Sequence, residues 1–129
     1  MRRIMFCLIM LLGIPAIAFG GQWEGTIQGL FCAIHGKICP TGQEDPYIAA
    51  ENTFVLMVDK DTWYLLPNLH QGIKTRHLND RVQVVGAKSP KYNAIEVQAL
   101  KVKKDGEWDT VWSKEMQKEV QEQFKTWGM

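Results

Sequence analysis

The stretch RVQVVGAKSPKYNAIEVQALKV, residues 81–102, decides the fold. Val82 and Val84 alternate with polar residues in its first part, and Ile95 and Val97 do so in its second. Alternation with a period of two is typical of β-strands that bury one face. Because the intervening residues SPKYN are turn formers, the stretch predicts two consecutive strands joined by a turn.

Two apolar runs upstream of this stretch predict a further hairpin. TFVLMV, residues 53–58, and WYLLP, residues 63–67, are separated by the four polar residues DKDT. Apolar runs separated by a short polar segment are typical of a β-hairpin. The weaker alternation in QWEGTIQGLF, residues 22–31, predicts the first strand of the domain.

Residues 68–80 change from a strand period to a helical one. Leu69 and Ile73 recur at helical spacing, and Asn68 precedes them as a candidate N-cap, so we expect a short helix here. His70 and His77 lie two turns apart on this helix. We interpret them as surface histidines, because two imidazoles need further ligands to fix a metal.

The C-terminal part of the chain predicts one more hairpin and a helix. Asp105-Gly106 lies between two β-type runs, which is a strong hairpin signal, and the last strand extends to Trp108 or Trp112. From residue 113 onward, large apolar residues recur every three or four positions and form one stripe on a helix, with Ser113 as its N-cap. The stripe consists of Trp112, Met116, Val120, Phe124 and Trp127.

The order of these elements resembles the OB-fold, a five-stranded Greek-key barrel with a helix between its third and fourth strands. The resemblance is carried by residues 81–102 and by the helical LHQGIKTRHLN before them, and it covers about residues 22–104. The chain is also similar to small secreted bacterial OB-type domains. The resemblance implies a mainly β, OB-like barrel over residues 21–112. Barrels of this kind bind oligonucleotides, sugars, proteins or small ligands on one face.

The helix over residues 113–129 has two interpretations. We expect its apolar stripe to pack on its own barrel and to enlarge a small core. The alternative is that the stripe docks a partner or a second copy of the chain, as amphipathic helices do in grooves.

The first 20 residues have the layout of a secretory signal peptide. Arg2 and Arg3 precede an apolar run of about a dozen residues, and small residues follow, with cleavage after Ala18 or Gly20. An uncleaved anchor is the alternative, but spanning a bilayer takes about 20 apolar residues. We therefore expect a periplasmic or secreted chain that keeps no stable membrane anchor after cleavage.

Charge and missing motifs narrow the function. The formal charge is +1 for the whole chain, and loss of the two leader arginines makes it −1. Without a basic field we expect no nucleic-acid partner. The sequence has no phosphate-binding loop, no H-E-x-x-H motif and no C-x-x-C-H haem motif, and no local motif marks a catalytic triad. We therefore expect a protein that is not an enzyme.

Two cysteines remain after the leader, in FCAIHGKICP at residues 31–40. Disulfides persist in oxidising compartments, so export favours a structural Cys32–Cys39 bond. The chain must double back between the two cysteines, and Gly36 can supply the positive φ that such a reversal needs. Closing this loop would stabilise the fold by about 2.5 kcal/mol.

A soft-metal site is the sharper alternative for this segment. Cys32, His35 and Cys39 could bind copper or zinc, although a fourth ligand would have to come from elsewhere. A thiol redox pair is a third interpretation, but the familiar C-x-x-C spacing is absent. In the preferred interpretation the protein uses no cofactor.

Aromatic residues in or beside the strands are candidates for a ligand face. Two or three of them on one exposed face would form a stacking platform for a sugar or another flat ligand. The candidates are Trp23, Phe31, Trp63, Tyr64 and Tyr92. We therefore predict a non-catalytic, extracytoplasmic binding or structural module of the bacterial cell envelope, whose partner is an unknown protein or small ligand.

Overall fold

The computed structural model describes residues 20–40 and 51–128 of the chain. The predicted signal peptide, apart from Gly20, lies outside the described residues. The elements along the chain are β1 (Gly21–Gly29), α1 (Leu30–Ile34), β2 (Phe54–Asp59), β3 (Thr62–Leu65), α3 (Gln71–Arg76), β4 (Arg81–Lys88), β5 (Ile95–Lys104), β6 (Glu107–Ser113) and α4 (Lys114–Thr126).

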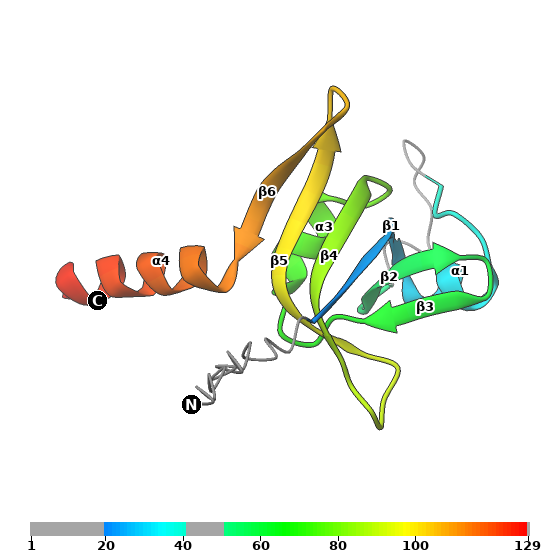
Figure 1. Ribbon diagram of the computed structural model, residues 1–129, viewed down its shortest axis with the longest axis horizontal. Helices are drawn as coiled ribbons and strands as arrows, with labels where there is room; N and C mark the ends of the chain where they lie inside the picture. The colour runs from blue at the N-terminus through cyan, green and yellow to red at the C-terminus, as the bar shows by residue number, and fades with distance from the viewer. Residues whose placement is uncertain (1–19, 41–50, 129) are drawn as a thin grey trace, which may run out of the picture.

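The strands form one six-stranded sheet in the order β3-β2-β1-β4-β5-β6, and every neighbouring pair is antiparallel (Figure 1). The prediction of a mainly β fold is therefore confirmed. The predicted strands all form, and α3 lies between β3 and β4 as expected. Helix α1 was missed, because its five residues are too few to show a helical period.

The prediction of a closed five-stranded barrel is corrected in part, because the sheet is open and has six strands. The extra strand is β6, which returns from the Asp105-Gly106 turn and pairs with β5 from Lys104 back to Ala99. Asp105 has φ of 51° and Gly106 of 81°. Positive φ at both central residues is the geometry that joins antiparallel strands tightly, so the hairpin prediction is confirmed.

The start of β5, which β6 does not reach, lies beside the end of β3 and the residues that follow it. Leu65 donates its N–H to Asn93 O at 2.8 Å, and it forms an isolated parallel bridge with Ala94. The side chain of Asn68 then exchanges two hydrogen bonds of 2.8 Å with the backbone N–H and C=O of Val97. An amide side chain thus takes the place of a strand residue at this point.

This role of Asn68 changes the start of the following helix. Asn68 was predicted to be the N-cap of α3, but its side chain is engaged by Val97. The helix begins two residues later than predicted, and His70 Nδ1 accepts a hydrogen bond from Gly72 N–H at 3.1 Å. His77 Nδ1 lies 3.0 Å from Asp80 Oδ2 at the other end of the helix. Both histidines therefore have local structural partners.

The main core lies on the face of the curved sheet that α3 covers. It is built from alternate residues of the strands, together with Leu66 and Leu69 before the helix. A smaller cluster lies on the opposite face of β2 and β3, where Val55 and Met57 pack against Ala33 of α1. The sheet thus buries apolar side chains on both faces near β2, but on one face elsewhere.

Gly36 has a backbone requirement that other residues meet poorly. Its φ is +63°, as the predicted chain reversal requires, and a Cβ built there would lie 2.8 Å from Lys60 O. Gly106 also has a positive φ, but nothing lies within 4 Å of its Cβ position. A comparison of the two positions therefore separates the cost of a left-handed backbone from the cost of a steric contact.

We predict that Gly36→Ala destabilises the fold more than Gly106→Ala. Both variants should lose about 1 kcal/mol from a left-handed backbone, and Gly36→Ala should lose about 1 kcal/mol more through the contact with Lys60 O. Chemical denaturation of both variants tests this. Equal losses would mean that the chain around Gly36 is looser than described.

Candidate binding groove

Helix α4 leaves the sheet at a well-defined start. The Ser113 hydroxyl accepts a hydrogen bond from Met116 N–H at 3.1 Å, which confirms the predicted N-cap. Lys114 Nζ lies 2.5 Å from Glu96 Oε1 on β5. The hydrogen bond and the charge of Lys114 lower the pKa of Glu96 below its ordinary value. The first turn is therefore attached to the sheet by a cap and an ion pair.

Beyond this first turn, α4 carries its apolar stripe into solvent. We expected the helix to pack on the barrel, but none of its residues is buried, and it extends away from the sheet in Figure 1. The exposed fractions are 42% for Met116, 49% for Val120, 45% for Phe124 and 66% for Trp127. Trp112 alone of the stripe is buried, because it belongs to β6 and joins the main core.

The exposed stripe forms one wall of an apolar groove of about 700 Å³. The α4 wall contains Met116, Val120 and Phe124, continued by Val111 of β6. Leu69 and Ile73, before and within α3, form the opposite wall. Large apolar surfaces that stay exposed in a folded protein mark interaction sites more often than chance.

The charged side chains around this groove are basic. Arg76 supplies the charge on the α3 wall, where His70 also lies with its Nδ1 engaged by Gly72 N–H. A smaller adjoining hollow, which shares Trp112 and two glutamines of α4 with the groove, adds Lys114 and Lys118. Within the described part of the chain, no aspartate or glutamate lines either hollow. The groove therefore suits an apolar segment that carries carboxylates.

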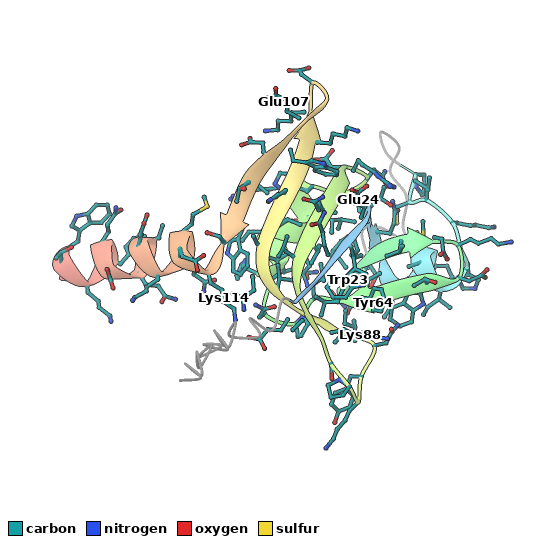
Figure 2. The ribbon with its side chains drawn as sticks, in the orientation of Figure 1. Trp23, Glu24, Tyr64, Lys88, Glu107 and Lys114 are labelled. Carbon is teal, nitrogen blue, oxygen red and sulfur yellow. The ribbon has the colours of Figure 1, made fainter. Side chains whose placement is uncertain are left out.

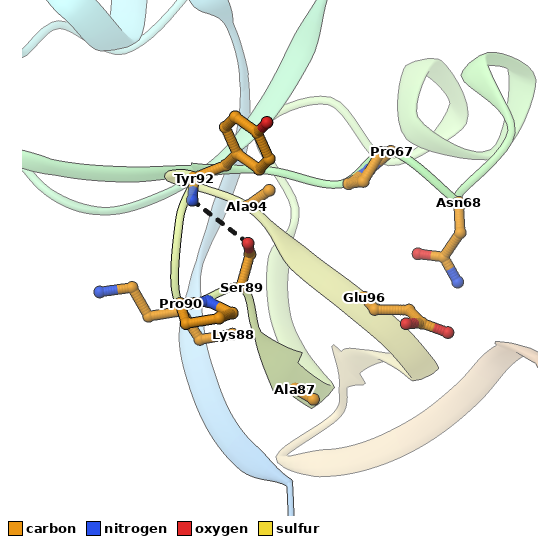
Figure 3. Close-up of a pocket in the computed structure, with 9 residues that line it drawn as sticks. All are labelled: Pro67, Asn68, Ala87, Lys88, Ser89, Pro90, Tyr92, Ala94 and Glu96. Atoms are coloured by element: carbon orange, nitrogen blue, oxygen red, sulfur yellow. Dashed lines mark hydrogen bonds between the residues drawn. The ribbon is translucent and has the colours of Figure 1, made fainter.

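A second hollow, of about 630 Å³, lies beside the turn between β4 and β5 (Figure 3). Several of its polar groups already have partners. Ser89 Oγ accepts hydrogen bonds from the N–H groups of Lys91 and Tyr92 at 3.3 and 3.2 Å. Glu96 is paired with Lys114, and Asn68 with Val97. The hollow therefore offers a ligand fewer free polar groups than its lining implies.

The structure places the five aromatic candidates for a ligand face in different regions of the molecule. Trp23 and Tyr64 are in contact, with centroids 6.1 Å apart, and Lys88 Nζ lies 5.5 Å from the Tyr64 centroid (Figure 2). Trp63 is the neighbour of Tyr64 in β3 and packs on the opposite face of the sheet, against the α1 cluster. One continuous stacking platform of the five is therefore not formed.

The remaining two candidates lie at the periphery. Phe31 is on α1, where its ring lies 4.5 Å from that of His35. Tyr92 is 72% exposed in the turn between β4 and β5, where it lines the second hollow. Trp23 and Tyr64 thus combine aromatic contact with a nearby cation.

Cys39 is an anchor between its loop and the sheet. Its Sγ accepts a hydrogen bond from Gly29 N–H at 3.2 Å, and its N–H donates to Gln28 Oε1 at 2.6 Å. Asn79 Nδ2 donates to Cys39 O at 2.8 Å. With 2% of its surface exposed, Cys39 is fully engaged by the end of β1 and by the segment before β4.

No disulfide joins Cys32 to Cys39 in the structure. Cys32 is on α1, whereas the Cys39 sulfur is directed to the backbone of β1, which gives the predicted cross-link a physical competitor. His35 Nδ1 lies 2.8 Å from Phe31 O. Residues 20–40 and 51–128 contain no cluster of three metal-ligating side chains. The cross-link and the soft-metal site therefore stay predictions.

We predict that Cys39→Ala destabilises the protein even when a reductant prevents any cross-link. The substitution leaves the buried Gly29 N–H without its acceptor, which costs about 1–3 kcal/mol. Cys32→Ala is compared with it, because it removes the same possible cross-link from a half-buried position. Denaturation in reductant should show the larger loss for Cys39→Ala, whose site is buried, and equal losses would contradict the anchoring role.

Lys74 is a buried cation on α3, with 8% of its surface exposed. Desolvation lowers the pKa of its amine below the ordinary value of 10.5. No carboxylate among the described residues forms an ion pair with it. Sequence reasoning missed this residue, because a lysine on a short helix is usually solvated.

We predict that Lys74→Met stabilises the protein at pH 7 and that the gain shrinks as pH rises. Below its folded-state pKa, the lysine has to keep its proton in a buried site, which favours the unfolded chain. Above 10.5 it is neutral in both states and the penalty disappears. Unfolding at several pH values between 7 and 10, with Lys91→Met as the exposed control, measures this. A gain independent of pH would contradict burial of the charge.

Comparisons with known proteins add no assignment. No family model matches the chain, and neither a curated protein nor a solved structure matches it at a significant level. In the described ranges, none of the helices has both the length and the apolar character needed to cross a bilayer.

Proposed function

We propose that this protein is a non-catalytic protein-binding module that takes an apolar segment of another polypeptide into the groove between α3 and α4. The observation that carries the proposal is the exposure of Met116, Val120 and Phe124 along one wall of a groove whose other wall is also apolar. A helix with this stripe is normally covered. Residues 20–40 and 51–128 of its own chain leave it open, so a partner gains by covering it.

We also propose that the open sheet is a variant of the OB-like barrel. The strand pairings β1–β2, β2–β3, β1–β4 and β4–β5 are those of a five-stranded Greek-key barrel. The Leu65–Ala94 bridge brings the end of β3 to the start of β5, where such a barrel would close. The fold itself leaves the ligand open, because OB-like barrels accept many.

The compartment is part of the proposal. The leader-like residues 1–20 favour export to the bacterial periplasm or the medium. A net charge of −1 after their removal disfavours nucleic acid as the partner. The groove favours a polypeptide over a small polar ligand, because both of its walls are largely apolar. Cys39 favours an anchoring role over a soft-metal or redox role, because its Sγ already accepts a hydrogen bond from Gly29 N–H.

The test is photo-crosslinking in intact cells that make the whole chain. A benzophenone amino acid at Val120 lies on the stripe, whereas the same group at Glu122 lies about 200° away on the helix. We expect a discrete adduct with a polypeptide at position 120 and none at position 122. The adduct at 120 should also disappear when Phe124→Asp is added, because this charge disrupts the apolar wall.

The following results would contradict the proposal. No adduct at Val120, or the same adducts at both positions, would contradict a protein-binding groove. Persistence of the Val120 adduct in the Phe124→Asp background would show that capture does not depend on the groove, and it would contradict the proposal as well.

A further inference from the structure

We propose that the segment that fills the groove is helix α4 of a second copy, so that two chains exchange their C-terminal helices around a two-fold axis. This inference rests on the proposed function and names its partner.

The charges of α4 are sorted by sign on either side of the apolar stripe. With 100° of rotation per residue, Lys114, Lys125 and Lys118 lie about 120°, 140° and 160° to one side of Val120. Glu119, Glu115 and Glu122 lie about 100°, 140° and 160° to the other side. The acidic edge nearest to the apolar face is therefore Glu119, and the other charges lie toward the back of the helix.

The glutamine side of the stripe faces the chain's own groove, and the acidic edge faces away from it. Gln117 and Gln121 line the groove beside the stripe, and Lys114 and Lys118 line the adjoining hollow. None of the three glutamates lines either hollow. Each glutamate is exposed and forms no ion pair with another described residue. The stripe therefore lines the groove, and the acidic edge lies beside it on the outward surface of α4.

The α3 wall of the groove is complementary to that outward surface. Arg76 is exposed there, and no carboxylate in the described ranges pairs with it. An apolar helix with glutamates along one edge would place them beside Arg76 and His70. The chain itself carries such a helix, so the same molecule supplies both halves of the contact.

A second copy can fill the groove, whereas the chain's own α4 cannot. Helix α4 forms one wall of its own groove, so it cannot also fill it. In a two-fold arrangement each α4 covers the stripe of the other and enters its groove at the same time. Trp127, which lies beyond the groove, would then also gain a covered position. A membrane surface fits less well, because the polar face of α4 has as many glutamates as lysines.

The experiment is sedimentation of the protein purified from cells that express the whole chain, from about 1 to 500 µM. We expect a reversible monomer–dimer equilibrium. Val120→Asp should abolish it, because a charge is placed at the centre of the apolar contact. Arg76→Glu and Glu119→Arg should each weaken the dimer about tenfold. The double variant should recover most of that loss, because it restores opposite charges with reversed signs.

Matched controls keep these results specific. Glu122→Arg has the same charge change as Glu119→Arg but lies at the back of the helix, so it should leave the dimer unchanged. All substituted residues are exposed, so each variant should keep the melting temperature of the parent chain under conditions where both are monomeric. These controls separate loss of the contact from loss of the fold.

The failures of the two proposals differ. A chain that stays monomeric throughout, yet gives a Val120 crosslink to a different polypeptide, overturns the second-copy inference and leaves the binding module standing. A monomer without any Val120 crosslink overturns both. A dimer that is insensitive to Val120→Asp, or one that the double charge variant fails to restore, also overturns this inference.

Discussion

The second edge of strand β5 is divided between two segments of chain, and the rest of the structure depends on that division. Leu65 bridges to Ala94 just before the strand, the Asn68 side chain bonds to Val97, and the later residues of β5 pair with β6. Because β6 already occupies the later part of this edge, it limits how far β3 can close the sheet. The same division fixes where α3 begins and where α4 leaves.

The groove is a direct consequence of this arrangement. Asn68 bonds to Val97 of β5 and Trp112 pairs with Leu100, three residues farther along the strand, and both line the groove and its adjoining hollow. The chain continues from Asn68 into α3 and from Trp112 into α4, so the two helices diverge from a common edge. The Ser113 cap and the Lys114–Glu96 pair stabilise the first turn of α4 in that direction. This geometry leaves an exposed wall of apolar side chains that a partner can cover.

Local patterns predicted much of the fold but little of the site. Period-two alternation and short apolar runs located the strands. Asp105-Gly106 located the last hairpin, and Ser113 marked the start of the C-terminal helix. Each of these signals is encoded in adjacent residues. The open sheet could not be predicted, since it depends on which segment pairs with the free edge of β5. For the same reason the stripe on α4 was expected to be packed, and the opposite wall of the groove was not foreseen. Cys39 seemed suited to a cross-link, and its three hydrogen bonds to distant residues had no sequence signal.

The central claim is that α4 carries its stripe away from the sheet, where the described part of its own chain does not cover it. Hydroxyl-radical oxidation of dilute, monomeric protein tests it most directly, because two residues of the same type serve as reporters. Trp127 is 66% exposed at the end of α4, whereas Trp112 is 6% exposed in the core. The account predicts rapid oxidation of Trp127 and slow oxidation of Trp112. Equal protection of both tryptophans would show that the helix folds back onto the sheet, and it would contradict the account.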